Sequence, residues 1–352
     1  MASNQLRILA PKPGNVKINL YPITLYLKEA FTISRDSYTE RRALIVELSA
    51  AGKKGFGEAS EHAYYGIDRD KMLRQAESLV PVVESYSFDN PTNFWRYMKP
   101  HVGNNSFLQC AIDNAAHDLY GKICNQPCHH IWGLKTNNLI KTSFTLSIDT
   151  IDKMVEKLKS TDFEIYKIKL GTTDDMGILR TLRQHTNAVF RIDANCAWTA
   201  EETIRYSHIM KDLGVEFIEQ PLKADDWKGM EVVRKHSALP VIADEACISE
   251  DMIPICAKHF QGINVKLMKC GGLTPALRMI EHAKNLGLKV MVGCMIESSV
   301  GCSAIAQLLP LLDYVDMDGA LLLADDPANG VKVLPDGSVV LPDKNGLGIE
   351  MK

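Results

Sequence analysis

Two lysines, Lys167 and Lys169, stand two residues apart at the end of a short apolar segment. On a β-strand this spacing places both ammonium groups on the same face. Neighbouring ammonium groups lower each other's pKa, which favours a role as general base. We therefore predict that Lys169 is a catalytic base. Lys167 is expected to keep Lys169 partly deprotonated and to contact a substrate carboxylate.

Three acidic residues follow at intervals of about 25 residues: Asp193, Glu219 and Asp244. Each ends a β-rich segment, in the sequences RIDAN, FIEQP and IADE. If these ends meet in space, the three carboxylates cannot all stay ionised without a cation. Oxygen ligands with positions left for water and substrate favour Mg²⁺. Taken singly, each acid could instead cap a helix or pair with a lysine, but the equal spacing favours a metal site.

Two polar residues next to these acids are expected to support the metal ligands without binding the metal. Asn195 shares the face of Asp193, whereas Glu245 is expected to point the other way or to pair with a lysine.

A further lysine, Lys266, ends a later segment (INVKLMK) and is expected to lie opposite Lys169. A metal that holds a substrate carboxylate can stabilise an enediolate while one lysine removes the α-proton. The other lysine would return a proton on the opposite face, so the predicted chemistry is a 1,1-proton transfer. Lys269, at a turn before two glycines, is expected to be solvated or structural.

Two more acids, Asp316 and Asp318, share one face of the last β-rich segment (YVDMDG). They are placed to bind a cationic substrate group such as an α-ammonium. The alternative is a turn or a helix cap near Gly319.

These residues fall at the ends of eight β-rich segments that alternate with amphipathic helices from about Asn138. This pattern predicts a (β/α)-barrel, whose active site lies at the C-terminal ends of its strands. The expected strands are Ile140–Leu146, Ile165–Leu170, Val189–Ala194, Val215–Gln220, Pro240–Asp244, Ile263–Met268, Lys289–Cys294 and Leu312–Met317.

The first part of the chain has a different pattern. Strands are expected at Val16–Tyr26 and Ala43–Ser49, then a glycine turn at KKGFGE entering another strand, then three helices. We therefore predict three regions: an α+β capping domain at 1–135, the barrel at 136–323, and a C-terminal segment at 324–352 that packs back on the capping domain.

Composition narrows the functional class. The net charge of −3 over 352 residues gives no indication of nucleic acid or of an anionic membrane as a partner, and no apolar stretch reaches a membrane span of about 20 residues. Nine cysteines without disulfide-like spacing, and no apolar signal-peptide region, lead us to expect a cytoplasmic enzyme. Cys124, Cys128, His129 and His130 lack the second pair of ligands that a zinc site needs.

The order KxK, DxN, EQP, ADE, NVK resembles the muconate-lactonising subgroup of the enolase superfamily over nearly the whole chain. Within it, the DxD at Asp316 and Asp318, with GCMIES and KLMKCGG, resembles the dipeptide epimerases of alanyl-glutamate epimerase type. The resemblance implies a modified TIM barrel and an Mg²⁺-dependent isomerase with Lys169 and Lys266 as acid and base. It also implies that the DxD motif and Glu297 bind a dipeptide, whose C-terminal residue is inverted at its α-carbon.

In that family, loops of the capping domain set the substrate, here Thr32–Tyr38 and Glu61–Ile67. Alanyl-glutamate epimerases place an arginine where this chain has Asp36, and Arg35 comes one residue early. A neutral or hydrophobic dipeptide is therefore expected, with Tyr64 and Tyr65 as apolar walls or as ordinary loop packing.

Other reactions use the same frame. Three alternatives act on substrates without a free amine to bind: an N-acylamino acid racemase, an o-succinylbenzoate synthase-like lyase and a cycloisomerase. Asp316 and Asp318 therefore favour the epimerase. A Schiff-base aldolase would need no metal triad, and a binding protein would be expected to have lost a ligand or a lysine. The exact dipeptide, its chirality and a homo-oligomeric state stay open.

Overall fold

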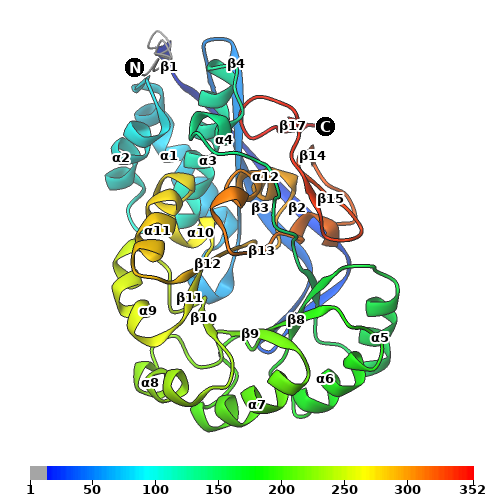
Figure 1. Ribbon diagram of the computed structural model, residues 1–352. Helices are drawn as coiled ribbons and strands as arrows, with labels where there is room; N and C mark the ends of the chain where they lie inside the picture. Colours follow the sequence, from blue (N-terminus) through cyan, green and yellow to red (C-terminus); the bar gives the residue numbers. More distant parts are fainter. Residues whose placement is uncertain (1–13) are drawn as a thin grey trace, which may run out of the picture.

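The protein is described from a computed structural model, which gives the placement of residues 14–352 (Figure 1). An antiparallel sheet with helices on one side precedes a ring of eight parallel strands. Helices α5 to α9 lie along the outer side of the parallel strands (Figure 1). None of the helices in residues 14–352 has the length and apolar character that a bilayer span requires.

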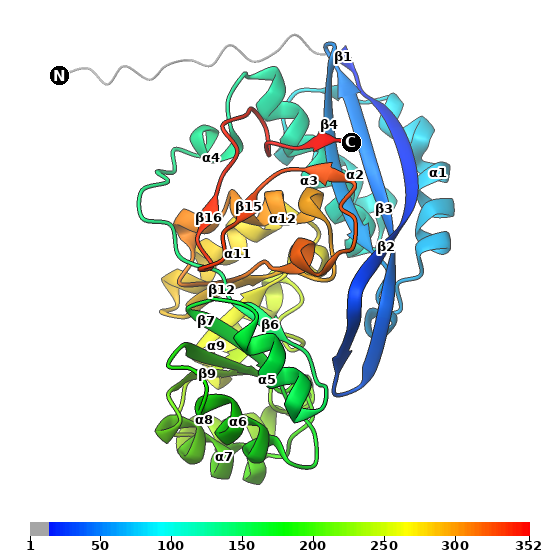
Figure 2. The same cartoon turned by 90° about the vertical axis from the view of Figure 1, so that its right-hand side faces the viewer.

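The N-terminal sheet has the order β2 (Lys17–Ile33), β3 (Asp36–Ala50), β4 (Lys53–Ser60). The hairpin of β2 and β3 is long, and its tip reaches the barrel strands (Figure 2). There the amide of Ile148 donates to Thr32 O at 2.9 Å. The hairpin thereby brings a loop of the N-terminal region to the barrel. Short strands β1 (Gly14–Asn15) and β5 (Ser87–Phe88) pair with each other.

Two helices, α1 (Arg69–Glu84) and α3 (Ser106–Ile123), pack on this sheet, and α2 (Pro91–Val102) packs on α3. The short α4 (Cys128–Ile131) follows. The expected glycine turn at 53–58 is wrong, because these residues belong to β4 and the turn is at Ala51 and Gly52. A Cβ on Gly57 would lie 2.0 Å from Ala111 O of α3. The glycines of β4 therefore allow α3 to pack closely on the strand. In the sequence, the same glycines are typical of a turn, which is why a turn was predicted there.

The parallel sheet contains a strand in each of the eight expected segments, in the order of the sequence, which confirms the predicted (β/α)-barrel. The ends of the sheet meet where Ser143 N donates to Val315 O at 3.5 Å and Met317 N donates to Thr142 Oγ1 at 2.9 Å. The strands are β6 (Phe144–Leu146), β7 (Ile165–Lys169), β8 (Val189–Asp193), β9 (Val215–Glu219), β10 (Val241–Ala243), β11 (Gly262–Val265), β12 (Lys289–Gly293) and β13 (Tyr314–Asp316).

Two strand boundaries differ from expectation. The segment Ile140–Leu146 forms a strand only from Phe144, because Thr142 N bonds instead to Gly337 O in the C-terminal segment. The segment Ile263–Met268 ends as a strand at Val265 and continues as a helical turn, α10 (Leu267–Cys270).

The remaining helices connect successive strands. The capping box of Thr199 and Glu202 opens α7, and the buried faces of the helices pack on the strands. They are α5 (Ile151–Lys159), α6 (Asp175–Arg183), α7 (Ala200–Asp212), α8 (Trp227–His236), α9 (Ile253–His259), α11 (Leu273–Asn285) and α12 (Ser299–Ala306).

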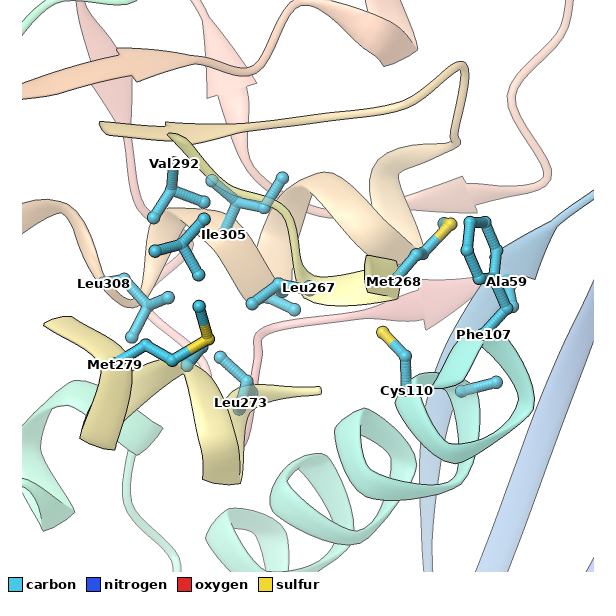
Figure 3. Close-up of a cluster of buried hydrophobic side chains, with 14 of the residues drawn as sticks. Ala59, Phe107, Cys110, Leu267, Met268, Leu273, Met279, Val292, Ile305 and Leu308 are labelled. Carbon is cyan, nitrogen blue, oxygen red and sulfur yellow. The ribbon is translucent and has the colours of Figure 1, made fainter. Parts of the chain in front are cut away.

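An apolar contact joins the N-terminal region to the barrel. Ala59 of β4 and Phe107 of α3 lie against Met268 of α10 (Figure 3). The amide of Ser60 also donates to the Met268 sulfur at 3.5 Å. This contact fixes the N-terminal sheet over the barrel strand that precedes Lys266.

The C-terminal segment returns to the N-terminal region. Ala324 N donates to Tyr26 O at 2.8 Å, and Leu347 N donates to Asp118 Oδ1 of α3 at 2.8 Å. The segment contains β14 (Ala328–Asn329), β15 (Lys332–Val333), β16 (Val339–Val340) and β17 (Glu350–Met351). The two domain boundaries, after residues 135 and 323, stay a prediction.

Candidate active site

Three carboxylates meet at the C-terminal ends of neighbouring barrel strands. Asp193 ends β8, Glu219 ends β9, and Asp244 directly follows β10. All three are buried, and one oxygen of each lies within 4.8 Å of the others. Across residues 14–352, this triad is the one group of three or more His, Cys, Asp or Glu residues that could hold a metal ion. Such an oxygen-only set suits a hard divalent cation.

Glu219 is the one member of the triad whose charge the protein does not fully compensate. Burial and the charge of Asp193 raise the pKa of Glu219 to about 7. Burial would also raise the pKa of Asp193, but the ammonium groups of Lys169 and Lys167 hold it below its usual range. A further cation would keep all three carboxylates ionised, so the residues present fit a bound divalent metal.

Two lysines reach the triad from different strands. Lys169 ends β7, and its Nζ lies 2.6 Å from Asp193 Oδ2. Lys266 follows β11, and its Nζ lies 2.8 Å from Asp244 Oδ2. Burial would lower the pKa of Lys266, but the charge of Asp244 raises it above its usual range. Each of these two amines is therefore paired with a carboxylate of the triad.

Two other lysines neutralise the buried acids. Lys167 shares the face of Lys169, as its spacing predicts, and its Nζ lies 2.8 Å from both Glu219 Oε2 and Asp316 Oδ2. Lys269 Nζ contacts Asp244 Oδ1 at 2.5 Å and is buried. Of the two expectations for Lys269, the solvated one is wrong and the structural one is confirmed, because the turn of α10 directs its side chain inward to Asp244.

Exposure separates these four lysines. The side chains of Lys169 and Lys266 are 9% and 11% exposed, and both line a cavity at the mouth of the barrel. Lys167 also lines this cavity but is only 2% exposed. Lys269 is 1% exposed and is not among the lining residues. Lys169 and Lys266 are therefore the lysines that can best reach a bound molecule.

Asp316 and Asp318 form an acidic end of the same cavity. Asp316 accepts from Ser143 Oγ at 3.1 Å, and Asp318 Oδ2 accepts from Thr145 N at 2.6 Å. Burial and the charge of Asp316 raise the pKa of Asp318 to about 7. Asp318 makes no side-chain cap bond to the short helix at Gly319, which disfavours the helix-cap alternative.

The tip of the β2–β3 hairpin supplies Arg35 to the cavity wall. The guanidinium donates to Glu245 Oε1 at 2.6 Å and to Asn195 O at 2.9 Å, and it lies over the Tyr64 ring. Glu245 lines the cavity and pairs with this arginine, so the expectation that it points away or binds a lysine is wrong. Asn195 Oδ1 and Glu245 Oε2 are buried without hydrogen-bond partners, which leaves acceptors beside the triad.

Two residues expected to bind substrate lie elsewhere. Asp36 is exposed and accepts from Ser37 N at 2.9 Å. Glu297 is buried and accepts from Met295 N at 2.8 Å, and burial with the charge of Glu58 raises the pKa of Glu297 to about 8. Neither residue is among those that line the cavity, and their roles in substrate binding stay a prediction.

Several wall residues were not identified from the sequence. Arg41 lies in β3, where polar residues at alternating positions usually face solvent. His62 lies in the loop Glu61–Ile67, which was expected to set the substrate, but no signal distinguished it within that loop. Thr145 belongs to no motif that would have marked it in the sequence. The complete set from the N-terminal region is Phe31, Ile33, Arg35, Tyr38, Arg41, Ser60, His62 and Tyr65.

Comparisons with known proteins agree with this fold and site. Residues 19–133 match the family model "Mandelate racemase / muconate lactonizing enzyme, N-terminal domain", and residues 149–352 match "Enolase C-terminal domain-like". The chain is 54% identical to the L-Ala-D/L-amino acid epimerase of a Maribacter species, covering 96% of this chain and 99% of that protein. It is 52% identical to the protein of the same name in Flavobacterium johnsoniae, covering 96% and 100%.

A solved structure supports the same relation. The dipeptide epimerase from Cytophaga hutchinsonii, complexed with Mg and the dipeptide D-Ala-L-Val, matches with a TM-score of 0.91 and 27% identity over 96% of both chains. The protein therefore belongs to the mandelate racemase and muconate lactonizing enzyme family of the enolase superfamily, in which it resembles the dipeptide epimerases and is an isomerase.

Proposed function

We propose that the protein is an Mg²⁺-dependent dipeptide epimerase that inverts the α-carbon of the C-terminal residue by a two-base 1,1-proton transfer. One observation carries this proposal: of the four lysines around the triad, Lys169 and Lys266 are the most exposed to the cavity, and they come from β7 and from the end of β11. Relatives that are 52–54% identical and named L-Ala-D/L-amino acid epimerases support the reaction class.

Asp193, Glu219 and Asp244 would hold the metal, with Asn195 and Glu245 as supporting residues. Bound Mg²⁺ supplies positive charge that stabilises a substrate carboxylate while the adjacent carbon is deprotonated. The Mg-containing dipeptide complex of the Cytophaga hutchinsonii epimerase supports the choice of metal.

The protein's own groups move the protons. One lysine, as the free amine, takes the α-proton, and the electron pair of the C–H bond moves into the carboxylate to give an enediolate. The other lysine, as the ammonium ion, donates a proton to the opposite face of that carbon. Inversion leaves the two lysines in exchanged protonation states, so the same pair can run the reaction in either direction.

Asp316 and Asp318 would bind the substrate's α-ammonium group. An acidic pair that lines the cavity favours a molecule with a free amine. An N-acylamino acid racemase or an o-succinylbenzoate synthase-like lyase has no such group to bind, so the pair favours the epimerase. Lys167, which bonds to Asp316, would hold this pair in place and lies close enough to the cavity to contact the substrate carboxylate.

The capping region at 1–135, the barrel at 136–323 and the returning segment at 324–352 remain our proposed division. All nine cysteines are free thiols in the structure, which supports a location in the reducing cytoplasm.

A deuterium-exchange screen tests the function. With Mg²⁺ in D₂O, a pooled set of dipeptides should gain one deuterium per molecule at the C-terminal α-carbon, read by mass spectrometry and proton NMR. The control is a set of N-succinylamino acids. If those exchange and no dipeptide does, the epimerase proposal is wrong and a racemase of acylated amino acids takes its place.

A further inference from the structure

Asn264 is a buried amide of β11 that faces the metal-type triad from the barrel interior. The residue is fully buried and stands two positions before Lys266, on the same face of the strand. Its Nδ2 donates a hydrogen bond to Glu219 Oε1 at 2.7 Å. Strand β10 lies between β11 and β9, which carries Glu219, so the amide reaches past one strand to make this contact. Asn264 therefore contacts a carboxylate of the triad without belonging to it.

Glu219 depends on this bond more than the other two acids depend on any one partner. Both carboxylate oxygens of Asp193 and of Asp244 accept hydrogen bonds, which fix the orientation of each group. Glu219 has one more rotatable bond in its side chain than an aspartate has. Across residues 14–352, the bond from Asn264 is the one hydrogen bond that the Glu219 carboxylate accepts. The orientation of this carboxylate therefore rests on the amide.

The two oxygens of the Glu219 carboxylate differ as a result. Oε1 is held by Asn264, whereas Oε2 is buried and forms no hydrogen bond, although Lys167 Nζ lies 2.8 Å from it. A buried carboxylate oxygen without a hydrogen-bond partner is costly unless another group compensates it. Oε2 is therefore the oxygen that can bind a cation. Asn264 sets its direction, because it fixes the other end of the same planar group.

The amide of Asn264 is itself confined. A Cβ on Gly293 of β12 would lie 2.8 Å from Nδ2, so the glycine leaves the space that the amide occupies. Asn264 Oδ1 is buried without a partner, and within the described residues the side chain makes a single hydrogen bond, to Glu219. Stability alone does not explain such an amide, because nothing offsets the desolvation of its acceptor. A role at the site does explain it.

We propose that Asn264 is a positioning residue that holds Glu219 so that Oε2 is presented to the bound metal. The proposal rests on the Mg²⁺-dependent function above and concerns a residue that is not among those lining the cavity. Groups that hydrogen-bond to metal ligands orient them, and their loss lowers metal affinity by about 10- to 100-fold. Mg²⁺ requires nearly ideal octahedral geometry, whereas Ca²⁺ accepts oxygen ligands in flexible arrangements. Loss of orientation should therefore weaken the binding of Mg²⁺ more than that of Ca²⁺.

The test is isothermal titration calorimetry of the metal-free protein with Mg²⁺ and, separately, with Ca²⁺. Asn264→Ala should raise the Kd for Mg²⁺ by about 10- to 100-fold. It should raise the Kd for Ca²⁺ by less than about threefold, because Ca²⁺ can follow the displaced carboxylate. Asn264→Ser removes the same donor and leaves a smaller void, so it should show the same pattern.

The matched control is Asn114→Ala. Asn114 is a buried amide of α3 that accepts from Leu273 N at 3.2 Å and donates to Cys110 Sγ at 3.4 Å. Its loss should lower the Tm but leave both Kd values near those of the wild type. Circular dichroism of the metal-free proteins shows which variants are folded, and if Asn264→Ala is not, the result for Asn264→Ser decides.

An unchanged Kd for Mg²⁺ overturns the assignment. An equal loss of affinity for Mg²⁺ and Ca²⁺ also overturns it, because that result indicates a general disturbance of the site instead of lost orientation. The same holds if Asn114→Ala weakens Mg²⁺ binding as much as Asn264→Ala does. If the wild type binds Mg²⁺ and the variants do not differ from it, only this inference fails. If the wild type binds neither ion, the metal site of the proposed function fails and the inference falls with it.

Discussion

Replacing Glu58 by Gln should make the stability of the protein less dependent on pH. Glu58 belongs to β4, and its buried carboxylate accepts bonds from Ser298 N at 3.1 Å and from Gly301 N at 3.3 Å. These donors lie at the start of α12, so the contact joins the N-terminal sheet to the barrel. Burial raises the pKa of Glu58 to about 7, although the hydrogen bonds oppose the shift.

The sign and the size follow from this pKa. In the unfolded chain Glu58 has the ordinary glutamate pKa of 4.5, so the folded protein binds the proton more tightly. Between about pH 4.5 and about pH 7, folding takes up a proton, and stability falls as the pH rises. The difference between the two pKa values corresponds to about 3 kcal/mol. Gln carries no charge, so this part of the pH dependence disappears in the variant.

Glu297 strengthens the effect. Burial and the charge of Glu58 raise the pKa of Glu297 to about 8, so the variant removes a cause of that shift as well. The assay is urea unfolding of the wild type and of Glu58→Gln between about pH 5 and about pH 8. Glu84→Gln, at the exposed end of α1, is the control with the same change of charge. Parallel pH profiles for the wild type and Glu58→Gln would refute the argument, as would a wild type that gains stability over this range.

Other predictions concern the site and the packing beneath it. Lys169→Ala and Lys266→Ala should each abolish epimerisation in both directions while still exchanging the α-proton of one stereoisomer in D₂O; full epimerisation by either variant rules out two bases. Exhaustive chelation should abolish turnover, and Mg²⁺ at about 100 times its Kd should raise the free energy of unfolding by about 2.7 kcal/mol, read as a shift in Tm; activity without metal contradicts the role of the triad. Gly57→Ala should lower the free energy of unfolding by about 2 kcal/mol or more, because its Cβ would lie 2.0 Å from Ala111 O and the helix would have to move; an unchanged urea midpoint contradicts the packing argument.

The barrel could be predicted because each of its units repeats a local pattern. An apolar segment ends in a polar residue, and an amphipathic helix follows, so eight strands could be counted from the sequence. The ends of parallel strands are neighbours in space, which is why Asp193, Glu219 and Asp244 could be grouped before the fold was known. Strand boundaries were less predictable. The amide of Thr142, for example, donates to Gly337 O of the C-terminal segment instead of to a neighbouring barrel strand, and a contact between residues so far apart in the sequence could not be predicted.

Side-chain partners across the two regions could not be predicted. Arg35 and Glu245 are 210 residues apart, and their contact depends on how far the β2–β3 hairpin extends. The position of Arg41 in the cavity wall was unpredictable for the same reason, because it depends on how the N-terminal sheet packs on the barrel. The spacing within a strand gives the face of a residue but not what covers that face.

The four lysines form two pairs, and in each pair one lysine is buried while the other is exposed to the cavity. In the pair Lys167 and Lys169, and in the pair Lys266 and Lys269, one side chain is 1–2% exposed and the other 9–11%. The buried member compensates carboxylates that could not otherwise be buried, and the exposed member presents its amine to the cavity. Spacing locates both pairs, but the order is reversed between them, since the buried lysine comes first in one pair and second in the other. Lys169 and Lys266, the two lysines predicted as bases, are the exposed members, because each stands where a strand ends: Lys169 is the last residue of β7 and Lys266 directly follows β11. The turn of α10 places Lys269 against Asp244, and this long-range contact could not be read from the spacing.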